Sequence, residues 1–136
     1  VSLLMHLAPK LDKDNLLIVF AGSEEISQEK PYWCYGYTKF EEENQRIIQE
    51  CDKITVVDTI GRGETQISSD KELMQEALIL NSRNYVDKTE MIVGEFDKAM
   101  EIYHSPIDTK DKLTNGEEAI DTVKDYLSDY MHQNLC

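Results

Sequence analysis

Residues 40–63 read FEEENQRIIQECDKITVVDTIGRG, and this stretch decides the fold that the sequence predicts. Its first half places apolar side chains on one helical face and charged or amide side chains on the other, so we expect a helix over Phe40–Cys51. Its second half, Ile54–Ile60, is short and rich in β-branched residues, which indicates a buried strand. The glycines of Gly61–Gly63 would end that strand in a turn.

Two further runs on either side of this stretch have strand character. Leu16–Ala21 (LLIVFA) is apolar and β-rich, so we expect a second buried strand there. Thr65–Ser68 follows the glycine turn and would return as a short hairpin strand.

Three helices are expected in the second half of the chain, because three start signals precede apolar residues at helical spacing. These signals are Ser-x-x-Glu at residues 69–72, Asp-x-x-Glu at 87–90 and Thr-x-x-Glu at 114–117. Gly94 interrupts the second pattern, so residues 91–96 (MIVGEF) could form a strand instead.

Few strands and many helices predict an α+β fold, with a small mixed sheet of two to four strands covered by about five helices. An α/β three-layer arrangement is the alternative. The length of 136 residues suits a single globular domain over residues 1–136. The chain begins at Val1 inside an apolar helical pattern, which leaves open that an N-terminal segment is missing.

Composition excludes several classes of function. Acidic residues outnumber basic ones by 27 to 14, and the net charge of −13 would repel nucleic acid but would attract a basic protein partner. No apolar run approaches the roughly 20 residues that span a bilayer, so we expect no membrane insertion. Three cysteines without a C-x-x-C pattern indicate reduced thiols in the cytoplasm, and the three scattered histidines predict no metal site.

An aromatic cluster suggests what the surface does. Tyr32, Trp33, Tyr35 and Tyr37 lie beside an acidic helix, and tyrosine and tryptophan are enriched at protein interfaces. Packing of these rings in the core is the alternative, above all for Trp33. The sequence therefore favours a small, acidic, cytoplasmic protein-binding domain of regulatory or inhibitory type, without catalytic activity and without a cofactor.

A second hypothesis comes from the order of motifs in the first half. Ser23 follows a β-rich run, and Tyr35-x-x-x-Lys39 stands twelve residues later at the start of a helix that leads to another strand. This order resembles the catalytic half of the short-chain dehydrogenases. Residues 35–43 (YGYTKFEEE) are similar to the YGxxKxxxE stretch of their extended, nucleotide-sugar branch.

The resemblance implies a role for each of these three residues. Tyr35 would be the acid/base, Lys39 its electrostatic partner and ribose ligand, and Ser23 the anchor of a carbonyl group. An ammonium one helical turn from a phenol can lower the pKa of that phenol. The family's nicotinamide cofactor needs a G-x-G-x-x-G turn, which these 136 residues lack.

A related possibility is a small-ligand site in an α/β enzyme. If Leu16–Ala21 and Ile54–Ile60 are parallel strands, their carboxyl ends place Gly22-Ser23 and Gly61–Gly63 at one edge of the sheet, where α/β ligand sites form.

Overall fold

The computed structural model describes residues 2–10, 16–22, 28, 34–72, 74, 85–102, 105–107 and 109–133. The chain divides into two compact units. Unit 1 consists of Val1–Ile18, Val57–Ile67 and Ile92–Cys136, and unit 2 consists of Val19–Val56 and Ser68–Met91.

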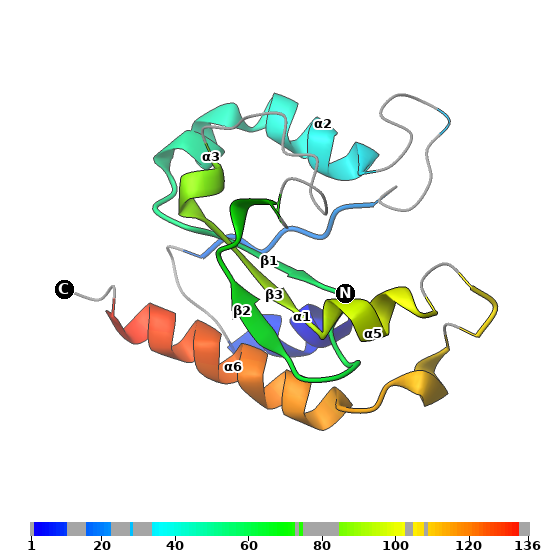
Figure 1. The fold of residues 1–136 in the computed structure, drawn as a ribbon. Coiled ribbons are helices and arrows are strands. Elements are labelled where there is room, and N and C mark those ends of the chain that lie inside the picture. Colours follow the sequence, from blue (N-terminus) through cyan, green and yellow to red (C-terminus); the bar gives the residue numbers. More distant parts are fainter. Residues whose placement is uncertain are drawn as a thin grey trace. The chain divides into compact units, whose positions relative to one another are not determined.

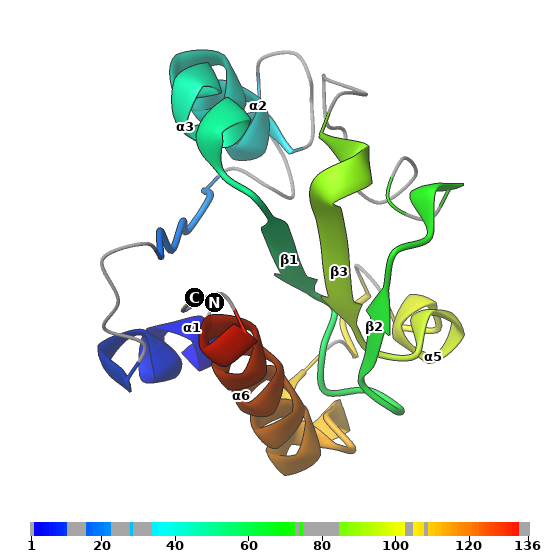
Figure 2. The same cartoon turned by 90° about the vertical axis from the view of Figure 1, so that its left-hand side faces the viewer.

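A three-stranded sheet contains β1 (Ile54–Asp58), β2 (Gln66–Ser68) and β3 (Thr89–Val93) in the order β1-β3-β2. The arrows in Figure 2 show that β1 and β3 run in the same direction and that β2 runs against them, so the sheet is mixed. This sheet, together with the helices around it, confirms the predicted α+β class with a small mixed sheet. The strand expected at Ile54–Ile60 is present over Ile54–Asp58, where its residues are half-buried rather than buried.

The central strand β3 corrects one prediction. A helix was expected after residue 87, but residues 86–88 form a 3-10 turn, η2 (Val86–Lys88), and β3 follows directly. Met91, Ile92 and Val93 are all buried, as befits a central strand with both faces covered. A helix begins only after Gly94, as the short α5 (Phe96–Met100). The alternative strand at residues 91–96 was therefore closer to the structure.

The core of unit 1 joins a strand to two helices. Leu7 of α1 (Ser2–Leu7), Ile92 of β3 and Val123 of α6 (Gly116–Gln133) are at most 1% exposed and form one cluster. Burying a side chain of this size stabilises the fold by roughly 1.5–3 kcal/mol. The short η1 (Ala8–Lys10) follows α1, and η3 (Lys110–Lys112) precedes α6.

The predicted strand at Leu16–Ala21 is wrong, because residues 16–22 form neither a strand nor a helix. Leu16 and Ile18 pack against the core cluster of unit 1, whereas Leu17 is 58% exposed. Part of this apolar run is therefore buried by side-chain packing, although the segment does not form the hydrogen-bond ladder that defines a strand.

The described residues 35–50 of unit 2 form two helices where one is expected. The predicted helix over Phe40–Cys51 is divided into α2 (Tyr35–Glu43) and α3 (Gln45–Glu50). The break lies at Asn44, whose backbone N–H and side-chain Nδ2 both donate to the Phe40 carbonyl oxygen at 2.9 Å. Asparagine side chains compete in this way with helical hydrogen bonds.

The end of α3 is capped from a distant part of unit 2. Lys88 Nζ donates to the carbonyl oxygens of Ile48 at 2.5 Å, Gln49 at 3.1 Å and Cys51 at 2.6 Å. A lysine ammonium satisfies the last carbonyl groups of a helix and opposes the negative end of its dipole.

The remaining start signals and turns have mixed outcomes. The α6 helix is present as predicted and begins at Gly116, but Thr114 does not cap it: its hydroxyl accepts from Gly63 N–H, and the Asn115 carbonyl oxygen accepts the first helical hydrogen bond, from Ala119 N–H. In the start signal at residues 69–72, the capping residue is Asp70 rather than Ser69, because the Glu72 N–H donates to Asp70 Oδ1 at 2.9 Å. Most of the helix expected after this cap lies outside the described residues. The hairpin pairing of β2 with β1 is wrong, since β3 lies between them.

Figure 1 shows α6 as the longest helix of the described chain. None of the helices in the described ranges is both long enough and apolar enough to cross a membrane.

Candidate functional sites

The first candidate site lies on α2 of unit 2. Tyr35 is the first residue of the helix, and Lys39 lies one turn later, with its Nζ 5.7 Å from the centre of the Tyr35 ring. The preceding Cys34 is buried and has a left-handed backbone (φ 53°), and its carbonyl oxygen accepts the first helical hydrogen bond, from Thr38 N–H. The predicted Tyr–Lys pair therefore shares one helical turn.

A close approach of two backbones brings a distant segment to this turn. Gly36 has no room for a side chain, because a Cβ atom there would overlap the carbonyl oxygen of Gly22. The residue that precedes Ser23 thus packs directly against the residue that follows Tyr35. Ser23 itself lies outside the described residues, as do Tyr32 and Trp33.

Neighbouring groups stabilise the protonated, charged form of Lys39. Its Nζ lies 2.6 Å from Glu42 Oε2, and that hydrogen bond and the carboxylate charge of Glu42 raise the pKa of Lys39, with a smaller contribution from Tyr35. The ammonium therefore stays protonated through the neutral pH range, next to a phenol. Tyr35 and Tyr37 are both half-buried, so the rings are neither core residues nor a fully exposed face.

The second candidate site lies in unit 1, where β1 and β3 end. After β1 the chain passes through Thr59, Gly61 and Gly63, all with positive φ (47°, 99° and 64°). The turn is fixed from both sides: Arg62 carbonyl oxygen accepts from Glu95 N–H at 2.9 Å, and Gly61 carbonyl oxygen accepts from Thr114 N–H at 2.9 Å. The predicted glycine turn is confirmed, and it joins the starts of α5 and α6.

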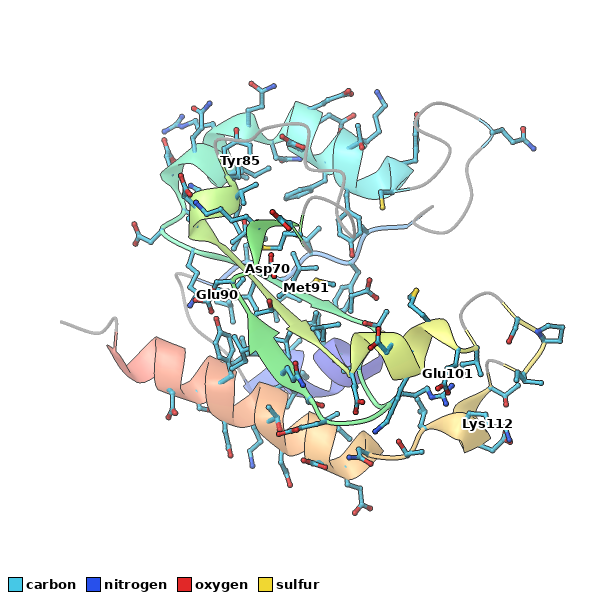
Figure 3. The ribbon with its side chains drawn as sticks, in the orientation of Figure 1. Asp70, Tyr85, Glu90, Met91, Glu101 and Lys112 are labelled. Atoms are coloured by element: carbon cyan, nitrogen blue, oxygen red, sulfur yellow. The ribbon has the colours of Figure 1, made fainter. Side chains whose placement is uncertain are left out.

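A pocket of about 80 Å³ opens beside this turn. Half of its lining is polar or charged and half is apolar; the lining residues are Thr59, Ile60, Arg62, Ala99, Ile102, Thr109, Lys112 and Leu113. All of them belong to unit 1. Figure 3 labels two charged residues of this region, Glu101 at the end of α5 and Lys112 in η3.

Arg62 is the most unusual side chain of this pocket. It is only 19% exposed, its Nη2 lies 3.5 Å from Glu101 Oε2, and its Nη1 is buried without a hydrogen-bond partner among the described residues. A buried donor without a partner costs about 1–3 kcal/mol, and more when the group is charged.

Thr59 has the same feature, since its Oγ1 is buried and has no hydrogen-bond partner in the described ranges. A β-branched residue with left-handed φ is a genuine outlier, because its Cβ crowds the backbone. Such outliers persist where the surrounding structure enforces them, and many of them lie at binding sites.

The expected ligand site at the strand ends needs a correction. Leu16–Ala21 forms no strand, and the parallel neighbour of β1 is β3, so Gly94 and Glu95 follow the second strand end in place of Gly22-Ser23. The sequence marked Gly61–Gly63 as a turn but missed Arg62 and Thr59. The available signal was MIVGEF, a second β-rich run that ends in a glycine.

Neither a protein-family model, nor a curated protein, nor a solved structure matches this chain. Among the residues with defined placement, histidine, cysteine and carboxylate side chains form no group of three or more that could hold a metal ion.

Proposed function

We propose that unit 2 carries an acid–base catalytic site of the short-chain-dehydrogenase type. In this proposal Tyr35 exchanges a proton with a hydroxyl or carbonyl oxygen of the substrate, and Ser23 orients that oxygen. The supporting observation is the packing of Gly22 against Gly36, which brings the segment before Ser23 to the helical turn of Tyr35 and Lys39.

The role of Lys39 in this proposal is electrostatic. Tyr35 contributes to the raised pKa of Lys39, and the interaction between two titrating groups is reciprocal. The positive charge of Lys39 therefore favours the phenolate form of Tyr35. A phenol that ionises closer to neutral pH exchanges a proton more readily with a substrate oxygen at that pH.

The residues present do not fit a complete dinucleotide site. The sequence has no G-x-G-x-x-G turn to bind the pyrophosphate of a nicotinamide cofactor. The proposal is therefore limited to proton transfer by the chain's own side chains, with no hydride step.

A titration of tyrosine absorbance tests the proposal without a substrate. Of the seven tyrosines, we expect one to ionise below the ordinary value of about 10. This early phase should disappear in Tyr35→Phe. It should move toward the ordinary value in Lys39→Met, because the neighbouring positive charge is then lost.

Lys98→Met is the matched control. Lys98 also pairs with a glutamate three residues away, with 2.7 Å between its Nζ and Glu95 Oε2, but no tyrosine contributes to its pKa shift. The early phase should persist in this variant. If Tyr35→Phe instead removes a phase that titrates at the ordinary tyrosine pKa, the proposed acid–base role of Tyr35 is wrong.

A second candidate function is binding of a basic protein in the cytoplasm by the aromatic segment Tyr32–Tyr37. It is favoured by α3, where Ile47 is 46% exposed next to the exposed Arg46. An exposed apolar side chain on a chain of net charge −13 suits a lysine-rich partner that contributes its own apolar residues.

The single tryptophan of the chain, Trp33, reports on this second function. A lysine-rich peptide should change its fluorescence at low salt, and a glutamate-rich peptide of the same length should not. We expect Tyr37→Ala and Ile47→Ala each to weaken this binding about tenfold, and raised salt to weaken it as well. Equal responses to both peptides would reject a charge-selective docking surface.

A further inference from the structure

The pocket of unit 1 has the chemistry of an anion site, although the protein as a whole is acidic. Its two charged lining residues, Arg62 and Lys112, are both cationic, in a chain of net charge −13. A general electrostatic attraction for anions is therefore absent, and any anion selectivity must come from this local arrangement.

The guanidinium of Arg62 is occupied at one edge and available at the other. Glu101 lies on the Nη2 side, while the buried Nη1 has no partner among the described residues. An arginine presents parallel N–H groups that match the two oxygens of a planar oxyanion. Arg62 lines the pocket, and a carboxylate bound there would pair with this unpartnered edge of its guanidinium.

Thr59 adds a second donor to the same pocket. Its hydroxyl is buried and has no partner among the described residues, and its left-handed backbone is held by the fixed turn that follows β1. A hydroxyl group and a guanidinium that line one pocket can both donate to a single anion.

The remaining lining selects the rest of the ligand. The apolar part of the lining consists of Ile60, Ala99, Ile102 and Leu113. A bare inorganic ion would place its charge against this apolar surface, which is unfavourable. A ligand with a charged end and a short hydrocarbon portion matches both halves of the lining. A volume of about 80 Å³ admits several water-sized groups and no large ring system.

We propose that this pocket binds a small aliphatic carboxylate, with Arg62 and Thr59 donating to the carboxylate oxygens. The apolar residues contact its hydrocarbon chain, and Lys112 adds charge at the pocket. This site is independent of the proposed acid–base function, because its residues all belong to unit 1.

Two-dimensional NMR of the full chain tests this proposal with butyrate, acetate and inorganic phosphate as probes. Butyrate should shift the amide signals of Gly61, Arg62 and Gly63. Each added CH₂ should tighten binding by up to about fourfold through burial of apolar surface, so butyrate should bind more tightly than acetate. Phosphate should bind more weakly than butyrate.

Variants then assign the binding to the named donors. Arg62→Lys should weaken butyrate binding at least tenfold, since the ammonium cannot reproduce the forked geometry. Thr59→Gly relieves the left-handed strain while it removes the hydroxyl, so this variant should fold and still bind several-fold more weakly. The exposed Lys124→Gln on α6 should bind as the parent does.

Three results would overturn the proposal. The first is the absence of amide shifts around Gly61–Gly63 at high butyrate concentration. The second is tighter binding of phosphate than of butyrate, which would indicate a phosphate site. The third is unchanged butyrate binding in both Arg62→Lys and Thr59→Gly.

Discussion

Replacement of Gly94 by alanine is expected to lower the free energy of unfolding by about 3 kcal/mol, at the upper end of the range for overpacking. An added Cβ would lie 2.5 Å from the Thr59 carbonyl oxygen and 2.7 Å from that of Arg62. Both are backbone atoms, and the Arg62 oxygen also accepts from Glu95 N–H. Because hydrogen bonds fix this turn from both sides, these backbone oxygens cannot move away easily, and the clash is not relieved. Urea denaturation followed by circular dichroism would measure the change.

Gly116→Ala is the matched control in the same unit. A Cβ at Gly116 meets nothing within 4 Å, and the residue begins α6. Alanine in a helix is favoured over glycine by roughly 0.5–1 kcal/mol, so this variant should be equal to or more stable than the parent. If Gly94→Ala and Gly116→Ala unfold at the same urea concentration, the close packing of Gly94 against the turn is incorrect.

The parts of the fold that sequence alone predicted are those with local causes. Strand β1 and the turn after it follow from a β-branched run that ends at two glycines, and both glycines have positive φ in the structure. The α6 helix follows from an amphipathic pattern of eighteen residues, long enough for its periodicity to be unambiguous.

The predictions that failed depended on tertiary partners. Leu16–Ala21 and Met91–Val93 are both short apolar runs, and such runs do not distinguish strand, helix and packed coil. Only Met91–Val93 is placed between two other strands, and it became the strand β3. The division of the predicted helix at Asn44 is a local effect that the apolar pattern does not register, because it comes from the hydrogen bond of the Asn44 side chain to the Phe40 carbonyl oxygen.

The candidate sites show the same limit. The spacing of Tyr35 and Lys39 is local, so their proximity on one helical turn could be predicted. The environment of Arg62 combines residues from the turn after β1 with Glu101, which lies 39 positions later in the chain. No short motif records that combination, and only the packing of β1 beside β3 brings these segments together.

Gly36→Ala is expected to lower the free energy of unfolding by about 2 kcal/mol and to detach the segment around Gly22 from α2. The new methyl group would overlap the Gly22 carbonyl oxygen, a backbone atom. Overpacking of this kind costs roughly 1–3 kcal/mol, and alanine regains up to about 1 kcal/mol of helix propensity. Because residues 16–22 belong to no strand, displacement of this segment is the least costly relief. Hydrogen exchange at Ala21 and Gly22 would measure the detachment.

The reciprocal variant, Gly22→Ala, separates the effect of the steric overlap from the effect of replacing a glycine by an alanine. A Cβ at Gly22 points into open space, so this variant changes the same contact pair without the overlap and should keep the parent's exchange rates.

Gly36→Ala leaves Tyr35 and Lys39 on their helical turn but moves the segment that leads to Ser23. The early tyrosine phase should therefore survive in Gly36→Ala, while any substrate orientation that depends on Ser23 is lost. Unchanged exchange at Ala21 and Gly22 in Gly36→Ala would remove the structural support for a site that combines Ser23 with Tyr35.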